Sequence, residues 1–216
     1  MAAAKGSSIS LSRREQNKRD KFNRIVAAAR ALFRNQGYEG TTTQQIADAA
    51  SIATGTLFLY AKSKEDLLVL VFSQEMSELI ESSFDQIDPT RPVSERVMKL
   101  FQSFIDYHAR DVDVARALIR ELTFLSNPAR IDTVLGIADA IHAKLTAIIE
   151  RAQTSGEISA AVDKQILARV LFSVYYQQLQ GWLGRVTTRT AFAASLQHTV
   201  VYLLANTPQR DGSHSQ

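Results

Sequence analysis

The sequence predicts an all-α protein, and three observations support this fold class. Only 9 Gly and 4 Pro occur among the 216 residues, so few positions interrupt a helix. Apolar residues recur three and four positions apart along most of the chain, which is the spacing of one helical face. No segment alternates apolar and polar residues with the period of two that a half-buried strand requires. We therefore expect a small N-terminal helical module joined to a larger C-terminal helical domain.

The composition excludes several classes of protein. The chain is 45 % apolar, which is enough for a hydrophobic core, and it contains no cysteine. Disulfides, thiolate catalysis and cysteine-based zinc sites are therefore excluded. No apolar run has the length of a signal peptide or of a bilayer span. These features predict a soluble, cytoplasmic protein without a membrane partner.

Positive charge is concentrated at the N-terminal end. Residues 1–36 contain nine basic and two acidic residues, a net charge of +7 in a chain whose total is +3. This asymmetry indicates an anionic partner at that end, although a solvated tail and helix face would look the same. Residues 1–18 are predicted to be a flexible basic arm, and residues 207–216 a flexible tail.

The first elements read as a long helix followed by two short ones. An apolar stripe from Phe22 to Phe33 predicts the long helix, and Gly37 is placed to end it. Thr42 and Gln45 fit a capping box at the start of a short helix. A turn at 51–53 and a second short helix at 54–60 follow. This order predicts a helix-turn-helix motif at 42–61.

The rest of the chain is predicted to be helical as well. Ser63 is a good N-cap for a helix from Lys64 into the 80s, and the DPTRP segment at 88–92 breaks that helix. We place the domain boundary inside this helix, giving an N-terminal domain at 19–79 and a C-terminal domain at 80–206. Further helices are predicted from the apolar stripes, over the ranges 93–105, 114–125, 131–149, 163–183 and 189–205.

The helix-turn-helix carries the residue types that duplex DNA requires. The second helix of such a motif enters the major groove, where hydroxyls and apolar groups reach base edges. Thr54, Thr56, Phe58, Leu59 and Tyr60 suit this role. Another group, at the N-terminus of the preceding helix, is suited to phosphate and comprises Thr42, Thr43 and Gln44.

Lys64 is unusual because it lies at the positive end of a helix dipole. A phosphate in front of it would explain its position, since the lysine, the dipole and the free N–H groups would then all face one anion. The alternative is that Glu65 and Asp66 already neutralise the dipole and that Lys64 lies in solvent.

Residues 22–70 resemble the DNA-binding domain of the tetracycline-repressor-like (TetR/AcrR) family of bacterial transcriptional regulators. The resemblance rests on the ungapped run AAARALFRNQGYEGTTTQQIADAASIATGTLFLYAKSKEDLL. It implies a repressor that binds a palindromic operator as a homodimer and is released by a small, largely apolar effector. No cofactor, metal or catalytic residue is implied.

This chain departs from the family pattern at four positions. Ser51 stands where a glycine is usual, and Ala53 where a serine usually caps the recognition helix. The missing cap hydroxyl should cost about 1 kcal/mol unless Thr54 or Thr56 replaces it. Phe58 and Ala61 stand where the family usually has tyrosine and phenylalanine. These departures bear on operator affinity and on which bases are read.

The resemblance also implies an effector cavity and a dimer interface in the C-terminal domain. For the cavity, the candidates combine aromatic bulk with polar groups: Phe101, Phe104, Tyr107, His108, Phe124, Tyr175, Tyr176 and Gln177. For the interface, the candidates follow apolar stripes on the last two helices: Leu167, Val170, Leu171, Val174, Trp182, Phe192, Leu196, Val200 and Leu203.

Two other functions were weighed against this one. An enzyme would need a catalytic or metal-binding motif, and the nearest match is a single Asp139-x-x-His142 pair. We therefore predict that the protein is not an enzyme. A sequence-independent nucleic-acid-binding protein, held by the basic N-terminal segment alone, is the alternative reading.

Overall fold

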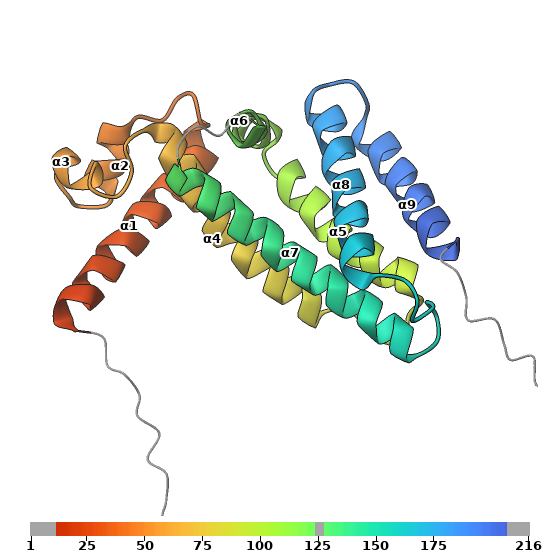
Figure 1. The fold of residues 1–216 in the computed structure, drawn as a ribbon. Helices are drawn as coiled ribbons and strands as arrows, with labels where there is room; N and C mark the ends of the chain where they lie inside the picture. The colour runs from red at the N-terminus through yellow and green to blue at the C-terminus, as the bar shows by residue number, and fades with distance from the viewer. Residues whose placement is uncertain (1–11, 124–127, 207–216) are drawn as a thin grey trace, which may run out of the picture. The chain divides into compact units, whose positions relative to one another are not determined.

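The computed structural model describes residues 12–123 and 128–206, and these parts of the chain are helical with no strand (Figure 1). No helix within these ranges has the combination of length and apolarity needed to cross a membrane. Internal packing divides the chain into two units, Met1–Val71 and Phe72–Gln216. The division falls inside a long helix, at an earlier position than the 79/80 boundary expected from the sequence.

The first unit begins with helix α1, Arg13–Gln36. Ser12 and Glu15 form a capping box: the Glu15 N–H donates to Ser12 Oγ (3.3 Å), and the Ser12 N–H donates to Glu15 Oε2 (2.9 Å). Residues 13–18 are therefore helical, and the prediction of a flexible arm is wrong for them. Residues 1–11 and 207–216 lie outside the described residues. Gly37 ends α1 as predicted, with a φ of 76°.

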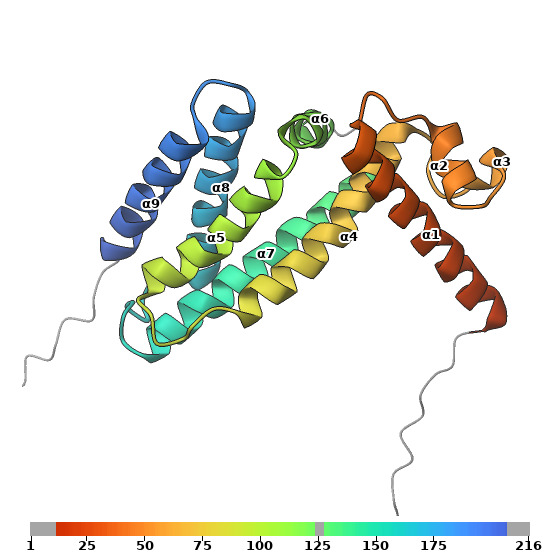
Figure 2. The same cartoon turned by 180° about the vertical axis from the view of Figure 1, so that it is seen from behind.

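Helices α2 (Thr43–Ala49) and α3 (Thr54–Leu57) follow, and Figure 2 shows them on one side of α1. The predicted capping box is confirmed, because the Gln45 N–H donates to Thr42 Oγ1 (3.2 Å) and the Thr42 N–H to Gln45 Oε1 (2.9 Å). Helix α3 is shorter than the predicted 54–60. After Leu57 the backbone tightens, and the N–H groups of Leu59 and Tyr60 donate to carbonyls three residues earlier.

The turn between α2 and α3 shows the consequences of two unusual residues. Ser51 adopts a left-handed conformation with a φ of 55°, which favours glycine. Ala53 occupies the N-cap of α3 and offers no side-chain acceptor. Thr54 does not replace it, because the Thr54 hydroxyl donates to Gln44 Oε1 (2.6 Å). Helix α3 therefore lacks the side-chain cap that stabilises most helix starts.

Helix α4 (Lys64–Asp85) begins with contacts to the segment that follows α1. Lys64 Nζ donates to the Tyr38 carbonyl (2.9 Å) and lies 4.3 Å from the centroid of the Tyr38 ring. The Tyr38 hydroxyl in turn donates to Glu65 Oε1 (3.0 Å). Ser63 caps α4 as predicted, accepting from the Asp66 N–H (3.2 Å). These bonds fix the first turn of α4 within the first unit.

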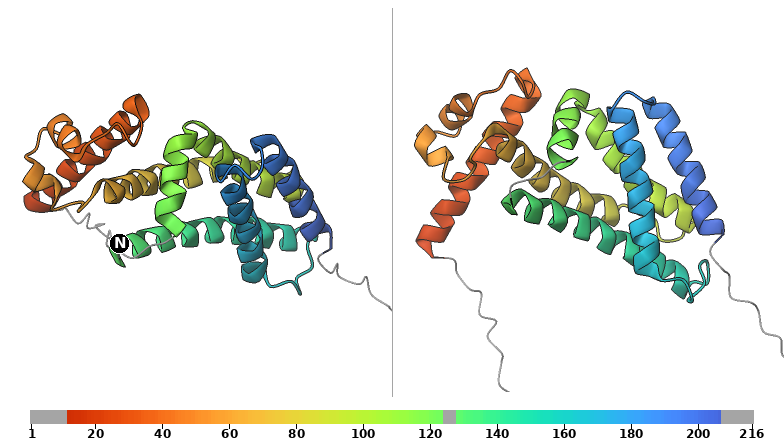
Figure 3. Two further views of the ribbon diagram at one scale, coloured as in Figure 1. Left: turned by 90° about the horizontal axis from the view of Figure 1, so that it is seen from above. Right: turned by 45° about the horizontal axis from the view of Figure 1, so that its top comes forward.

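The second unit contains the rest of α4 and five further helices. Helix α7 packs against α8 and α5, and α9 packs against α5 and α8. Figure 3 shows α8 and α9 side by side and antiparallel. Helix α7 is longer than predicted at both ends, and its first residue is a proline, which suits the first position of a helix. The bounds are α5 Val93–Ala109, α6 Val112–Thr123, α7 Pro128–Thr154, α8 Lys164–Leu183 and α9 Arg189–Ala205.

An ion pair between the buried Arg96 and the exposed Glu157 joins the start of α5 to the turn between α7 and α8. The Arg96 guanidinium is almost fully buried and donates to Glu157 Oε1. The other carboxylate oxygen of Glu157 accepts from the Val93 N–H (2.8 Å), where Pro92 provides no side-chain cap. Burial acts to raise the pKa of Glu157, but the Val93 N–H, the Ser155 hydroxyl and Arg96 outweigh it, so the net direction is downward.

The uncapped start of α3 leads to a first prediction. Substituting Ala53→Ser should stabilise the first unit by about 1 kcal/mol, because the serine hydroxyl would accept from a backbone N–H in the first turn. Amide hydrogen exchange of the full chain should show slower exchange at 54–61. The control is Ala53→Val, which adds bulk without an acceptor and should give no protection. Equal effects of the two variants would contradict the capping argument.

The contacts of Lys64 lead to a second prediction. Lys64→Met keeps the apolar stem but removes the hydrogen bond to the Tyr38 carbonyl and the contact with the Tyr38 ring. The loss should be about 1–2 kcal/mol, measured by hydrogen exchange in α1 and α2 of the full chain. Lys62→Met is a neighbouring control, because the Lys62 ammonium donates only locally to the Phe58 carbonyl (2.7 Å). Unchanged exchange in Lys64→Met would show that its ammonium has no structural role.

Candidate nucleic-acid interface and apolar cavity

A short hydrogen-bond chain on the surface of α2 and α3 fixes these two helices to each other. The Thr54 hydroxyl donates to Gln44 Oε1, and Gln44 Nε2 donates to Asp48 Oδ1 (2.9 Å). Leu57 is fully buried beneath them. Both Gln44 and Thr54 were predicted to contact DNA, and the structure brings them together on one surface. Their polar groups are therefore oriented before any ligand binds.

The segment that follows α3 presents apolar side chains to solvent. Leu59 is 77 % exposed and Phe58 is 38 % exposed, although both are large and hydrophobic. Thr56 is half-buried between them and the core. Exposed apolar groups beside hydroxyls match the requirements of the major groove, where the thymine methyl is an apolar target.

Two predicted phosphate-binding positions are engaged within the chain. The Thr42 hydroxyl accepts the Gln45 N–H as the cap of α2, while Thr43 is half-buried beside it. Lys64 is only 20 % exposed and, besides the Tyr38 contacts, lies 3.9 Å from Glu39 Oε2. The alternative in which Lys64 lies freely in solvent is therefore wrong, and a phosphate contact by Lys64 stays a prediction.

A basic groove lies between the first turns of α1 and the end of the helix-turn-helix. The Tyr60 ring packs 6.4 Å from the Phe22 ring, and the Tyr60 hydroxyl approaches the Lys18 carbonyl at 3.5 Å. The sequence reading missed this groove because it assigned residues 13–18 to a flexible arm. The capping box at Ser12 was the available signal. The lining residues are Arg13, Arg14, Asn17, Lys18, Lys21 and Tyr60.

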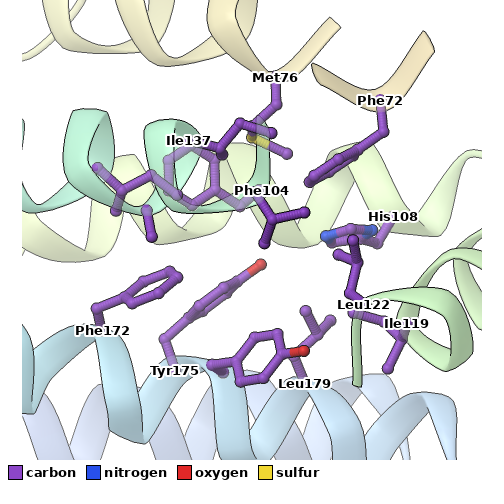
Figure 4. Close-up of a pocket in the computed structure, with 14 residues that line it drawn as sticks. Phe72, Met76, Phe104, His108, Ile119, Leu122, Ile137, Phe172, Tyr175 and Leu179 are labelled. Carbon is purple, nitrogen blue, oxygen red and sulfur yellow. The ribbon is translucent and has the colours of Figure 1, made fainter. Parts of the chain in front are cut away.

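The second unit contains a cavity of about 250 Å³ with an almost entirely apolar lining (Figure 4). Helices α4 to α8 all contribute side chains to it, so it lies among the helices of this unit. Such a lining suits an apolar ligand. The lining residues are Phe72, Met76, Phe104, His108, Ile119, Leu122, Val134, Ile137, Ala138, Ile141, Phe172, Tyr175, Tyr176 and Leu179.

The predicted cavity residues divide into three groups. Phe104, His108, Tyr175 and Tyr176 line the cavity. Phe101, Tyr107 and Gln177 do not line it, and their contact with a ligand stays a prediction. Phe101 is core behind Tyr175, the Tyr107 hydroxyl donates to Glu75 Oε2 (2.7 Å), and Gln177 is exposed. Phe124 lies outside the described residues.

Sequence reasoning missed most of the lining. The predicted lining consisted of aromatic and polar residues. The residues that were missed are aliphatic, and from the sequence they could equally be core residues: Met76, Ile119, Ile137 and Ile141. Phe72 and Phe172 are aromatic but carry no polar group. No sequence signal distinguishes a cavity wall from a filled core, because both are apolar at helical spacing.

Two polar groups of the cavity are buried and neutral. Burial lowers the pKa of His108 to about 4, so the imidazole is uncharged at neutral pH. Burial also raises the pKa of Tyr175, with a smaller contribution from Tyr176. The pKa of Tyr176 is raised by burial as well, although hydrogen bonds with Thr123 and Gln180 act in the opposite direction.

The residues of the predicted dimer interface lie mainly on the inner face of α8 and α9. Most of the predicted residues are buried within the chain, because this stripe packs against the other helices of the same unit. The Trp182 and Phe192 rings, for example, stack 5.9 Å apart. The buried residues are Leu167, Leu171, Trp182, Phe192, Leu196 and Val200, and their part in a dimer stays a prediction. Val174 and Leu203 are half-buried, and Val170 is 39 % exposed.

The opposite face of these helices carries exposed apolar residues. Ile166 on α8 is 58 % exposed, and Val201 and Tyr202 on α9 are 44 % and 63 % exposed. Together with Val170 they define the surface that we call the outer α8–α9 face. A surface of this kind is typical of a protein interface.

The Asp139–His142 pair lies on α7 and is not among the residues that line the cavity. His142 packs edge-on against the Phe172 ring (5.1 Å), and burial lowers its pKa, partly opposed by Asp139. Within residues 12–123 and 128–206, no three acidic or histidine side chains come together as metal ligands.

Comparison with known proteins places both units in one family. The family model of tetR-type bacterial regulatory proteins matches residues 25–71, and that of the tetracyclin repressor-like C-terminal domain matches residues 90–182. The matches cover the helix-turn-helix and most of the helices that form the cavity.

Individual relatives extend over nearly the whole chain. The transcriptional repressor KstR of Rhodococcus jostii is 31 % identical over 97 % of this chain and 94 % of its own length. The fatty acid metabolism regulator of Bacillus subtilis is 27 % identical over 78 % of this chain and 86 % of its own. The structure of Thermus thermophilus FadR has the same fold, with a TM-score of 0.68, 24 % identity, and coverage of 90 % and 98 %. The chain therefore belongs to the tetR family of bacterial regulatory proteins, and it is a DNA-binding regulator of transcription.

Proposed function

We propose that the protein is a ligand-responsive repressor that binds a palindromic operator as a homodimer and leaves it when an apolar effector occupies the cavity. The observation that carries this proposal is the presence of two separate sites in one chain. One is the exposed α2–α3 surface, and the other is the apolar cavity of the second unit. The relatives from Rhodococcus and two mycobacteria, all named as repressors, support the direction of control.

For the operator, we assign base contacts to α3 and phosphate contacts to its surroundings. Thr54, Thr56, Phe58 and Leu59 would face the major groove, with Gln44 beside them. Thr42, Thr43, Tyr60 and Lys64 would contact the DNA backbone. The basic groove of α1 would add phosphate contacts next to Tyr60.

For the dimer, we assign the outer α8–α9 face as the contact surface. Two copies of this face, related by a two-fold axis, would bury Ile166, Val170, Val201 and Tyr202 in a four-helix arrangement. Dimerisation would present two α3 segments to two half-sites about 34–36 Å apart.

For the effector, the lining of the cavity favours a ligand with an apolar body. FadR of Thermus thermophilus is described in complex with lauroyl-CoA and that of Bacillus subtilis with stearoyl-CoA. Acyl-CoA esters are therefore the first effectors to test. Helix α4 would carry the signal, because it supplies Phe72 and Met76 to the cavity and Lys64 to the first unit.

The operator assignment gives a third prediction. Selection of bound fragments from random duplex DNA should yield a palindrome. Leu59→Ala should weaken binding to the selected fragment about ten-fold and leave binding to random DNA unchanged, because it removes a base contact. Lys18→Ala should weaken binding to both and reduce the salt slope by about one, because it removes a phosphate contact.

Lys99→Ala is the control for the charge change, because Lys99 lies on α5 in the other unit and should affect neither property. A selected sequence without a palindrome, or equal losses for Leu59→Ala on all sequences, would favour a sequence-independent nucleic-acid-binding protein.

Adding lauroyl-CoA or stearoyl-CoA at fixed salt forms a second arm of the titration. Unchanged affinity for the selected fragment would reject acyl-CoA esters as effectors.

The dimer assignment gives a fourth prediction. Val170→Glu and Val201→Glu should each convert a dimer to monomers in sedimentation equilibrium, because a two-fold contact would bury the introduced charge without a partner. Leu135→Glu is the matched control, since Leu135 is 56 % exposed on α7, outside the assigned face. Dissociation in the control alone, or dimers in both interface variants, would place the interface elsewhere.

A further inference from the structure

Two polar atoms in the cavity have no hydrogen-bond partner among the described residues. They are Nδ1 of His108, on α5, and the hydroxyl oxygen of Tyr175, on α8. His108 is 4 % exposed and Tyr175 is 3 % exposed. Both side chains line the same cavity, whose other walls are nearly all apolar. In Figure 4 the Tyr175 hydroxyl points from α8 toward the part of the cavity where Phe104 and His108 lie.

Such an arrangement is unfavourable for stability alone. A buried polar group without a partner destabilises the folded state, and nearly all buried polar groups in proteins are bonded. Phenylalanine at 175 would fill the same space without this cost. The neighbouring Tyr176 shows the usual solution, because its hydroxyl bonds with Thr123 and Gln180.

Packing holds both groups in fixed orientations. The Phe101 ring stacks on Tyr175 at 4.9 Å with an interplanar angle of 8°, and Phe104 meets Tyr175 edge-on at 5.9 Å. The His108 ring stacks on Phe72 at 6.3 Å, and Tyr107 meets it edge-on at 5.1 Å. Neither group can turn toward another partner without disturbing these contacts, so both are preorganised for a ligand.

Both groups are also uncharged at neutral pH, since burial lowers the pKa of His108 to about 4 and raises that of Tyr175. A neutral imidazole and a neutral phenol exchange hydrogen bonds with a hydroxyl or a carbonyl oxygen. They do not compensate a buried carboxylate or ammonium, whose desolvation would be costly in this apolar space.

We infer that His108 and Tyr175 form a polar anchor that binds a neutral oxygen, a hydroxyl or a ketone, on the apolar body of the effector. This inference rests on the proposed function only in taking the cavity as the effector site. It narrows the ligand class from apolar molecules in general to apolar molecules that carry one uncharged oxygen inside the cavity. Any charged group of the ligand would remain outside it.

The test uses small bicyclic probes and no DNA. Tetralin, 1-tetralol and 1-tetralone share one skeleton and differ in the presence of a hydroxyl or a ketone. Their dissociation constants are measured for the wild-type full chain, for Tyr175→Phe and for Tyr176→Phe. The ratio of the tetralin constant to the 1-tetralol constant should fall about ten-fold in Tyr175→Phe. It should stay at the wild-type value in Tyr176→Phe, because the Tyr176 hydroxyl is already bonded.

A second readout distinguishes an anchor from a structural tyrosine. Tyr175→Phe should raise the melting temperature of the ligand-free chain, because it removes an unpartnered hydroxyl, whereas Tyr176→Phe should lower it.

The tetralin 1-carboxylate anion should not compete with 1-tetralol. An unchanged ratio in Tyr175→Phe, a lower melting temperature in that variant, or failure of all neutral probes to bind would each overturn the inference. The operator titration is separate, so an effector that leaves DNA affinity unchanged would reject the proposed function while the anchor still stands.

Discussion

The first unit depends on one constraint: a helix of a single turn, such as α3, cannot be stable by itself. Contacts with neighbouring residues stabilise α3 instead. Leu57 is buried in the core, the Thr54 hydroxyl bonds to Gln44 on α2, and α2 is fixed by the Thr42–Gln45 capping box. Gln36, at the end of α1, donates to Gln45 Oε1 (3.0 Å) and so joins the longest helix of the unit to α2. The short helix is thus held by its neighbours rather than by its own propensity, and it needs no cap at Ala53 to persist.

The second unit differs, because it must remain folded although it encloses a cavity of about 250 Å³. Its stability comes mainly from apolar core residues outside the cavity lining, such as Leu100, Leu145 and Leu171, which are fully buried. The contact of Lys144 with Glu81 (2.6 Å) adds an ion pair. The same Lys144 ammonium lies 4.5 Å from the Phe84 ring, so α7 is tied to α4 at a point separate from the cavity lining. With these contacts in place, the cavity walls are free to carry residues that do not favour stability. His108 and Tyr175 fit this description.

Helix ends that are set by nearby residues could be predicted from the sequence. Which face is buried could not be predicted for a helix that has two apolar faces. The caps at Ser63 and Thr42 and the end of α1 at Gly37 follow from local chemistry, and all three were predicted. On α8, by contrast, Leu171 and Val170 are neighbours in sequence and both apolar, yet one is buried and the other exposed. The spacing of apolar residues reveals both stripes on α8, but it does not indicate which stripe packs against the core of the same chain. The partner of Lys64 was equally inaccessible, because Tyr38 is 26 positions away.

Lys64 therefore illustrates how a correct observation can have two physical explanations. A cation at the positive end of a helix dipole needs compensation, and a DNA phosphate is one possible source. The structure supplies another, since the Tyr38 carbonyl and ring accept the ammonium while Glu65 and Asp66 follow it in the first turn. The two explanations differ in the state of the protein in which the Lys64 contact acts. A phosphate contact would act only in a complex with DNA, whereas the Tyr38 contact holds the first turn of α4 within the first unit without DNA. Because α4 also supplies Phe72 and Met76 to the cavity, the proposed coupling between effector and operator would depend on the second role.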